Sequence, residues 1–371
     1  MKDIVIIGGG IAGLINAIML SKAGFSVLVI EKKHYPLHKV CGEYISNEVV
    51  PFLKSIGAFP SELKPSHIHR LLITTENSSF KSNLDMGGFG ISRYNFDYYL
   101  YQKAKEAGAK FLLDTEVIEV QKREEIFCII TSAENTIHTK LVIGAHGKRS
   151  RLDKQLDRSF FYKRSPYIGV KYHVKSNFTS DTIALHIFKK GYCGISKIEE
   201  DKYCLCYLSS RDNLKYYKNI KEMEENILYK NPYLKDIFLN SEFLYEKPEV
   251  INEISFIKKP LIENGIFMCG DAAGMITPLC GNGMSIAIHS AKILSQLLIT
   301  NHSNNRFDYY NIEKQYIEKW DGCFKNRMAA GRLIQKLFLT KALPAIAMHA
   351  IKKSSSLARW AIEKTHGHSF E

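Results

Sequence analysis

Six residues near the N-terminus form a Gly-x-Gly-x-x-Gly motif of the kind that binds the phosphates of a dinucleotide. The motif runs from Gly8 to Gly13 and includes Ala12. Gly8 permits a tight turn, Gly10 lets the backbone approach a pyrophosphate, and Gly13 lets the following helix pack on the preceding strand. The free N–H groups at the start of that helix offer a partly positive site to phosphate oxygens.

An acidic residue, Glu31, follows Gly8 at the spacing at which a carboxylate accepts the hydroxyl groups of an adenosine ribose. An acid at this place favours an unphosphorylated ribose, and therefore FAD or NAD rather than NADP. Residues 3–7 and 25–30 are rich in β-forming residues, and residues 14–20 have an apolar helical pattern. The chain is therefore expected to begin with a strand, helix and strand that together bind a dinucleotide.

A second glycine-rich segment, residues 270–284, narrows the choice of dinucleotide. It contains Gly-Asp-Ala-Ala-Gly and ends in Gly-Asn-Gly-Met, after a short apolar strand at 266–269. An amphipathic helix is expected from this point to about Thr300. A plain NAD enzyme has no use for such a segment, so its presence favours FAD.

These motifs resemble those of the class A flavoprotein oxidoreductases, the superfamily of para-hydroxybenzoate hydroxylase, and are most similar to the geranylgeranyl reductase family. The resemblance covers residues 1 to about 300. It implies an α/β fold: a Rossmann-like, glutathione-reductase-like FAD-binding domain with an inserted antiparallel β-sheet substrate domain and C-terminal helices. It also implies that Asp271 binds the ribityl chain of FAD. The glycines Gly281 and Gly283 would let a helix N-terminus lie against the isoalloxazine, where its partial positive charge stabilises reduced flavin.

Two shorter segments extend the resemblance. Residues 36–43 resemble a P-x-x-K-x-C-G-G/E motif whose cysteine lies close to the flavin, and residues 91–97 resemble an R-x-x-F-D motif whose arginine contacts FAD. A thiol at Cys41 would donate the proton that completes an alkene reduction, or would simply be a small residue that fits beside the ring. The expected cofactor-binding residues are Gly8, Gly10, Ala12, Gly13, Glu31, Lys32, Lys39, Arg93, Asp271, Gly281, Gly283 and Met284, and Cys41 is the expected catalytic residue.

One segment departs from the superfamily pattern. Many class A hydroxylases carry an Asp-Gly motif after the strand near residue 145, where this chain has His146 and Gly147. An imidazole does not make the hydrogen bonds of a carboxylate. The substitution therefore argues against a standard NADPH-dependent hydroxylase, while the other motifs still predict FAD binding.

The chain is expected to pass repeatedly between two domains. The segment from Gly191 to Ser196 is expected between two strands, either lining the substrate cavity or forming a plain hairpin. The expected FAD-binding domain consists of residues 1–65, 92–155 and 255–300, the substrate domain of 66–91 and 156–254, and the C-terminal helical region of 301–371.

Composition excludes several classes of protein. With 371 residues, 45% apolar and 24% charged, the chain is too apolar for disorder and has no fibrous repeat. The formal charge of +13 favours an anionic partner, but no nucleic-acid-binding signature is present, so no nucleic acid is expected. The eight cysteines are scattered, which indicates free thiols in a reducing compartment, and His67 and His69 lack a third ligand, so no metal is expected. The apolar segments are too short to cross a bilayer, and a cytoplasmic protein is predicted.

The C-terminal residues 320–371 hold nine lysines and arginines and three acids, interleaved with leucine and isoleucine. This pattern predicts either a helical cap over the core or a peripheral contact with a membrane surface that admits a lipid-like substrate.

Three functions are consistent with the sequence. The first is an FAD-dependent reductase of C=C bonds in a hydrophobic, prenyl-like or lipid-like small molecule, with NADH or NADPH as electron donor. The second is an FAD-dependent monooxygenase acting on an aromatic or polyketide-like substrate. A flavin halogenase is less favoured, because the Trp-rich G-W-x-W-x-I-P motif is absent and the only tryptophans are Trp320 and Trp360. The third is a non-catalytic lipid-binding escort, which the intact flavin motifs argue against.

Overall fold

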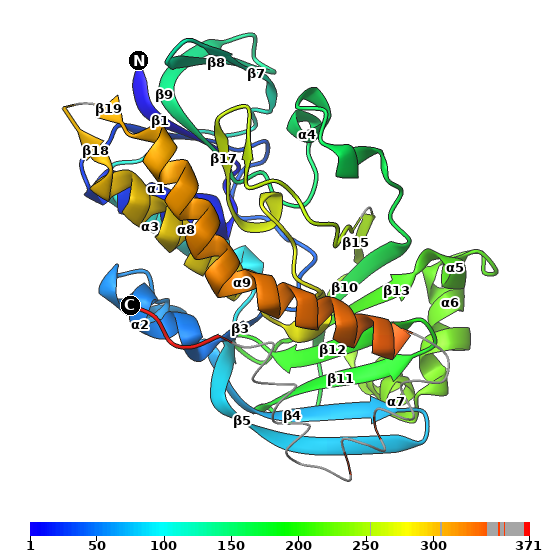
Figure 1. Ribbon diagram of the computed structural model, residues 1–371. Helices are drawn as coiled ribbons and strands as arrows, with labels where there is room; N and C mark the ends of the chain where they lie inside the picture. Colours follow the sequence, from blue (N-terminus) through cyan, green and yellow to red (C-terminus); the bar gives the residue numbers. More distant parts are fainter. Residues whose placement is uncertain (253, 305, 340–347, 349–351, 353–366) are drawn as a thin grey trace.

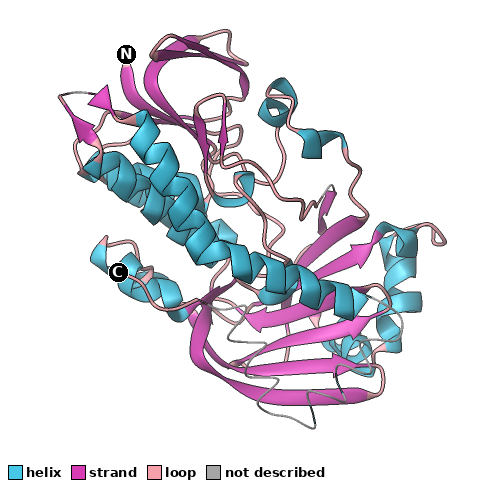
Figure 2. Cartoon of the chain, in the orientation of Figure 1, coloured by secondary structure: helices cyan, strands magenta, loops and turns pink. Residues whose placement is uncertain are grey.

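A computed structural model describes residues 1–252, 254–304, 306–339, 348, 352 and 367–371. The described residues form two large sheets, which lie at opposite ends of the folded molecule (Figures 1 and 2). Helices pack beside each sheet. The longest helix of the described residues, α9 (Tyr309–Leu339), runs from the first sheet across to the second (Figure 1).

The first sheet is mainly parallel and contains the N-terminal strand, helix and strand. Its central strands contain short buried apolar runs, Ile4–Ile7, Val27–Ile30 and Leu141–Ile143, as expected for strands covered on both faces. Strand order is β16-β17-β9-β1-β2-β6, with β7 and β8 continuing from β9. The strands are β1 (Lys2–Ile7), β2 (Val27–Ile30), β6 (Lys110–Leu112), β7 (Val117–Arg123), β8 (Ile126–Thr131), β9 (Thr136–Gly144), β16 (Ile262–Glu263) and β17 (Ile266–Met268).

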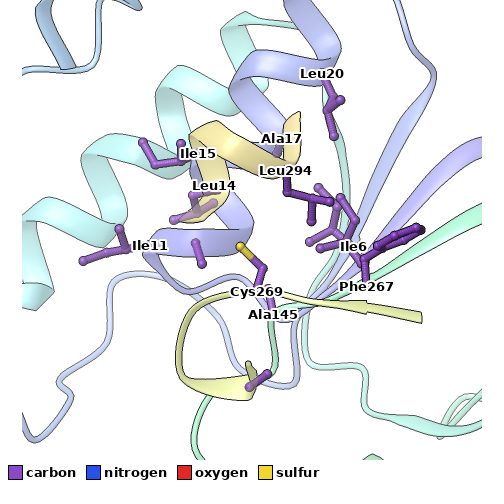
Figure 3. Packing of buried hydrophobic residues seen from close by; sticks show 14 of the residues in the cluster. Ile6, Ile11, Leu14, Ile15, Ala17, Leu20, Ala145, Phe267, Cys269 and Leu294 are labelled. Atoms are coloured by element: carbon purple, nitrogen blue, oxygen red, sulfur yellow. The ribbon is translucent and has the colours of Figure 1, made fainter. Parts of the chain in front are cut away.

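Three helices cover one face of the parallel strands: α1 (Ile11–Lys22), α3 (Arg93–Glu106) and α8 (Gly283–Thr300). Figure 3 shows Leu294 of α8 close to Ile6 of β1, and Leu14 of α1 belongs to the same buried cluster. The buried Asn16 joins the two helices, because its amide donates to Ala12 O (2.8 Å) and accepts from Ser295 Oγ (2.8 Å). Since α1 and α8 pack against each other, the two glycine-rich segments that precede them are held in the same part of the molecule.

The second sheet is mainly antiparallel, in the order β14-β10-β13-β12-β11-β4-β5-β3, and β15 also pairs with β10. Only the β11–β4 pair of this sheet is parallel among the described strands. The strands are β3 (Tyr44–Ser46), β4 (Ser66–Thr75), β5 (Ser78–Gly90), β10 (Tyr167–Lys175), β11 (Thr182–Phe188), β12 (Gly191–Lys197), β13 (Tyr203–Ser210), β14 (Glu242–Phe243) and β15 (Glu249–Asn252). The α/β fold with an antiparallel sheet is confirmed, while the exact domain boundaries stay a prediction.

Smaller elements complete the described chain. One face of the second sheet is covered by α6 (Ile220–Ile227) and α7 (Pro232–Asn240), whose apolar residues pack on β10, β12 and β13. The remaining elements are α2 (Val50–Ser55), α4 (Arg151–Gln155), α5 (Arg211–Leu214), α6 (Ile220–Ile227), α7 (Pro232–Asn240), β18 (His302–Ser303), β19 (Arg306–Phe307) and the short 3₁₀ turns at 47–49, 61–63, 159–162, 228–230, 270–272 and 278–280.

The segment from Gly191 to Ser196 lies between the strands β11 and β13, as the sequence predicts, and is itself a strand. It forms most of β12 and hydrogen-bonds to β11 on one side and β13 on the other. Tyr192, Cys193 and Ile195 are all buried, so burial of apolar side chains on both faces favours a central strand over a hairpin loop. The turn itself lies at Lys190, which has a φ of 56°.

A buried carboxyl group, Glu224 on α6, lies beneath the second sheet. Its Oε1 accepts hydrogen bonds from the hydroxyls of Tyr172 (2.9 Å) and Tyr207 (2.8 Å). Burial raises the pKa of Glu224 to about 7, although the two tyrosine hydroxyls favour the ionised form. Folding therefore takes up a proton at Glu224 between the pKa of the unfolded carboxyl and pH 7.

Glu224 should make the protein less stable as the pH rises. Below the unfolded pKa of 4.5 the carboxyl is protonated in both states, and between 4.5 and about 7 only the unfolded state ionises. The free energy of unfolding should fall by about 2–3 kcal/mol across this range because of Glu224 alone. Urea unfolding from pH 5 to pH 8 should show that Glu224→Gln removes this component and that the exposed Glu225→Gln keeps it. An identical pH dependence in wild type and Glu224→Gln would contradict the assignment.

Candidate functional site

The first glycine-rich turn has the geometry that its sequence requires. Gly8 has a φ of +105°, and a Cβ at Gly8 would collide with the carbonyl oxygen of Ala145. A Cβ at Gly13 would collide with the carbonyl oxygen of Gly8. These close approaches bring β1, β9 and the start of α1 together, so no larger residue fits at either position.

Gly10 faces two cations rather than packed backbone. It is the N-cap residue of α1, and a Cβ there would lie 3.8 Å from Lys39 Nζ and 3.9 Å from Arg93 Nη2. Asp97 holds both cations, because its carboxylate accepts from Arg93 Nε (2.6 Å) and Nη2 (2.7 Å) and from Lys39 Nζ (2.9 Å). A helix N-terminus flanked by two fixed cations fits a pyrophosphate.

The carboxylate of Glu31 lies beside the same turn. It is buried, and it accepts hydrogen bonds from the backbone N–H groups of Gly9 (2.7 Å) and Lys33 (3.1 Å). An open pocket lies above it, at the carboxyl ends of β1, β2 and β9. The pocket is lined by Ile7, Gly8, Ile30, Glu31, Lys32, Thr115, Glu116, Val117, His146, Ser150 and Leu152.

The second glycine-rich segment leads to the N-terminus of α8. Gly281 has a φ of +67°, and a Cβ there would lie 3.2 Å from the ring of Tyr44. The first turn of α8 contains no acidic residue, and the Oγ of Ser285 is buried without a hydrogen-bond partner among the described residues. The helix N-terminus and this hydroxyl are therefore suited to an electron-rich ring edge. Met284 is buried in the same turn.

Asp271 lies between the two helix N-termini. Burial raises the pKa of Asp271, while the positive charges of Lys259 and Arg93 act in the opposite direction. Lys259 is buried, and its ammonium group donates to the carbonyl oxygens of Asp271 (2.9 Å) and Lys148 (2.8 Å). Burial lowers the pKa of Lys259 to about 8. The second glycine-rich segment contacts the start of α1 at Ala12, because a Cβ at Gly270 would lie 2.9 Å from the Ala12 methyl group.

Cys41 lies close to Arg93 and to the second sheet. The backbone N–H of Glu43 donates to its sulfur, and burial raises the pKa of the thiol although Arg93 opposes this. The Cys204 thiol on β13 donates to the carbonyl oxygen of Cys41 (3.2 Å). A thiol in these surroundings stays protonated at neutral pH and can act as a proton donor.

Sequence reasoning missed a buried ion cluster next to Cys41. Glu43 Oε1 accepts from Lys171 Nζ (2.5 Å), and Glu43 Oε2 lies 2.6 Å from His173 Nε2. The Nδ1 of His173 lies 2.7 Å from the Tyr245 hydroxyl. Burial would raise the pKa of Glu43, but Lys171 and His173 lower it to about 2. The sequence held one indication of this cluster: Lys171 and His173 lie two residues apart, and so on the same face, in the mainly apolar strand β10.

The same cluster includes metal-ligating atom types. Donor atoms of Glu43, His173 and Cys204 all lie within 4.8 Å of one another. The buried ammonium group of Lys171 already neutralises the carboxylate, so the chain itself provides the cation that this site needs. His67 and His69 lie exposed on β4, and His69 pairs with Asp181 (3.3 Å).

An apolar face of the second sheet packs against the second glycine-rich segment. Ile187, Tyr192 and Leu208 pack there against Met275 and Leu279, and Ile334 of α9 lies against this cluster. Next to it, Leu185, Gly194 and Cys206 are adjacent on neighbouring strands and only partly buried. A Cβ at Gly194 would have no neighbour closer than 3.7 Å. This surface suits an apolar ligand.

Part of the basic C-terminal region lies outside the described residues, including Leu343, Ile346 and Ile351. The described part, on α9, exposes Leu333 and carries Lys325 and Lys336 on its surface. Among the described residues, no helix combines the length and the apolar character needed to cross a membrane.

Comparison with known proteins places this geometry in context. A family model described as an FAD binding domain matches residues 1–318. A digeranylgeranylglycerophospholipid reductase from Methanococcus vannielii is 25% identical over 345 residues, covering 86% of this chain and 82% of the relative.

Two solved structures share the fold. The flavin-dependent brominase Bmp2 superposes with a TM-score of 0.80 at 21% identity, covering 100% of this chain and 94% of the brominase. A geranylgeranyl bacteriochlorophyll reductase-like protein from Thermoplasma acidophilum superposes with a TM-score of 0.76 at 18% identity, covering 99% of this chain and 92% of that protein. At these identities the two structures show a common architecture and leave the reaction open.

Proposed function

The chain belongs to the FAD binding domain family, and from that premise we propose that it is a reductase that saturates C=C bonds in a prenyl-like or other lipid-like substrate. As a member of a family of FAD-dependent oxidoreductases it is an enzyme, so the non-catalytic escort hypothesis is set aside. One observation favours a reductase over a monooxygenase. The thiol of Cys41, which burial keeps protonated, lies beside Arg93 and next to the second sheet, whose surface is apolar.

The residues that would hold FAD follow from the two helix N-termini. Arg93 and Lys39 would bind the pyrophosphate beside Gly10, and Glu31 would accept the ribose hydroxyls. Asp271 and the start of α8 would receive the ribityl chain and the ring. When bound, FAD supplies hydride chemistry at its ring.

The chain's own contribution to the reaction is positioning, water exclusion and a proton. The partly buried apolar surface at Leu185, Gly194 and Cys206 would bind the hydrocarbon substrate and exclude water. The Cys41 thiol would give its proton to the substrate carbon that has not received hydride, forming a C–H bond and leaving a thiolate that solvent reprotonates. Arg93 stabilises that thiolate.

Anaerobic reduction of the bound FAD tests the proposal. NADH, NADPH and dithionite would each be added, and the reduced enzyme would then be mixed with a polyprenyl alkene or with oxygen. We expect the alkene to reoxidise the flavin and gain two hydrogens, and oxygen to react slowly without product. Incorporation of an atom of ¹⁸O₂ into an aromatic substrate would instead support the monooxygenase alternative, for which the brominase-like fold is the favouring observation.

Glu31 should contribute directly to FAD affinity. Glu31→Ala removes the acceptor for the ribose hydroxyls and should weaken FAD binding by about 1–3 kcal/mol, the cost of a lost hydrogen-bond partner. Fluorescence titration of the apoprotein with FAD measures this, and Glu106→Ala on the exposed face of α3 is the matched control. Unchanged affinity in Glu31→Ala would show that the ribose lies elsewhere.

The basic C-terminal region should bring the enzyme to a membrane surface, where a lipid-like substrate resides. Its nine basic and three acidic residues predict binding to anionic vesicles that weakens as salt rises, because surface charges are screened beyond about 10 Å at 0.1 M salt. Vesicle co-sedimentation checks this, with Lys325→Gln and Lys336→Gln reducing binding. Equal binding to neutral and anionic vesicles, or binding to neither, would reject a peripheral location.

A further inference from the structure

His146, at the end of β9, is a buried side chain with an unused polar atom. Its side chain is 5% exposed, and its Nδ1 has no hydrogen-bond partner among the described residues. The same residue lines the pocket above Glu31, together with Gly8 and Ser150. A buried ring nitrogen without a partner is costly unless a ligand satisfies it.

A second buried group fixes the orientation of this imidazole. His146 Nε2 lies 3.1 Å from Asp153 Oδ1, and Asp153 also accepts from Arg158 Nη1 (2.8 Å) and from the backbone N–H of Ser150 (2.7 Å). Burial would raise the pKa of Asp153, but His146 and Arg158 lower it to about 2. Donation of the Nε2 proton to this carboxylate leaves Nδ1 as the ring nitrogen that can accept a hydrogen bond.

Arg158 extends this network to the other end of the site. Its guanidinium is fully buried and donates from Nη2 to the carbonyl oxygens of Ala272 (3.1 Å) and Pro260 (3.0 Å). Ala272 directly follows Asp271. Asp153 and Arg158 therefore connect His146 to the second glycine-rich segment.

We propose that Nδ1 of His146 accepts a hydrogen bond from a hydroxyl group of the adenosine ribose of FAD. The pocket lies at the ends of the strands that flank the first glycine-rich turn, which is where the adenosine half of a dinucleotide lies. Glu31 and His146 both line this pocket, and a ribose offers two hydroxyl donors. The inference rests on FAD as cofactor and is independent of the reductase proposal.

Two variants separate the two ring nitrogens. His146→Gln places an amide near the position of Nε2, which keeps the bond to Asp153 and removes the acceptor in the pocket. His146→Asn places an amide near the position of Nδ1, which keeps that acceptor. His138→Gln, at an exposed position on the same strand, is the control.

The experiment compares ADP, 2′-deoxy-ADP and 3′-deoxy-ADP by calorimetric titration of the apoprotein, with FMN as the probe for the other half of the cofactor. Wild type and His138→Gln should bind ADP about tenfold more tightly than one of the two deoxy compounds, the effect of one hydrogen bond. His146→Gln should lose that preference, His146→Asn should retain it, and FMN affinity should be the same in all four proteins.

An unchanged preference for ADP in His146→Gln would overturn the proposal, and so would weaker binding of FMN alone. If His146→Gln does not fold, equal affinities of wild type for all three adenosine compounds would overturn it just as directly. Because each measurement is a binding affinity, failure of the reductase proposal would leave these results unchanged.

Discussion

Replacing Cys41 with serine should lower the rate of alkene reduction about 10²–10⁴-fold, the usual contribution of a general acid, while FAD stays bound. Serine has nearly the same size as cysteine, so the packing against Arg93 is retained. Its hydroxyl is a far weaker acid than a thiol, and the proton that completes the reduction would have to come from water. Single-turnover reoxidation of the reduced enzyme by substrate measures the step directly.

Cys128→Ser is the matched control, because Cys128 is a partly buried thiol on β8 of the first sheet and has no part in the expected FAD or substrate site. That variant should keep its rate within about a factor of two, since no proton transfer is assigned to it. Full activity in Cys41→Ser would leave Cys41 as a packing residue and would shift the preference to the monooxygenase.

Removing the charge of Glu43 should destabilise the protein by about 3–5 kcal/mol, because Lys171 would remain buried without a counter-ion. Glu43→Gln retains the size of the side chain and removes only the charge. Urea unfolding of the apoprotein at pH 7 measures the loss. The double variant Glu43→Gln with Lys171→Met should regain much of it, because the uncompensated charge is gone.

The exposed pair between Lys175 and Glu242 provides the control, since both side chains are more than half exposed. Glu242→Gln should change stability by less than about 1 kcal/mol. The pH dependence has a defined sign: the pKa of Glu43 is lowered to about 2 in the folded state, so its stabilisation is present above pH 4.5 and is lost as the pH falls toward 2. A Glu43→Gln variant as stable as Glu242→Gln would contradict the ion cluster.

Glu43 also adopts a backbone conformation that is unusual for glutamate. Its φ is 54°, in the left-handed region that favours glycine. A glutamate there stores strain that its bonds to Lys171 and His173 must offset. The sequence showed the glutamate, but the partners that justify it are more than a hundred residues away.

The sequence by itself determined the features that depend on neighbouring residues. The turn at Gly8, the helix that begins after Gly10, and the carboxylate of Glu31 beside that turn all follow from local backbone requirements and regular spacing. The glycine-rich segment before α8 was recognisable for the same reason, since Gly281 requires a positive φ. Burial of short apolar strands between helices also made the α/β class predictable.

Only the tertiary structure decided which distant polar groups meet. In the sequence, Lys171 and His173 are ordinary strand residues, and only the folded sheet brings them against Glu43. His146 appears in the sequence as a replacement for an aspartate, and only the structure shows that Asp153 and Arg158 orient its ring. Gly191 to Ser196 likewise became a central strand because both of its neighbours were available for pairing. Burial of a charge or a ring nitrogen depends on which elements pack around it, and a linear pattern of residues does not contain that information.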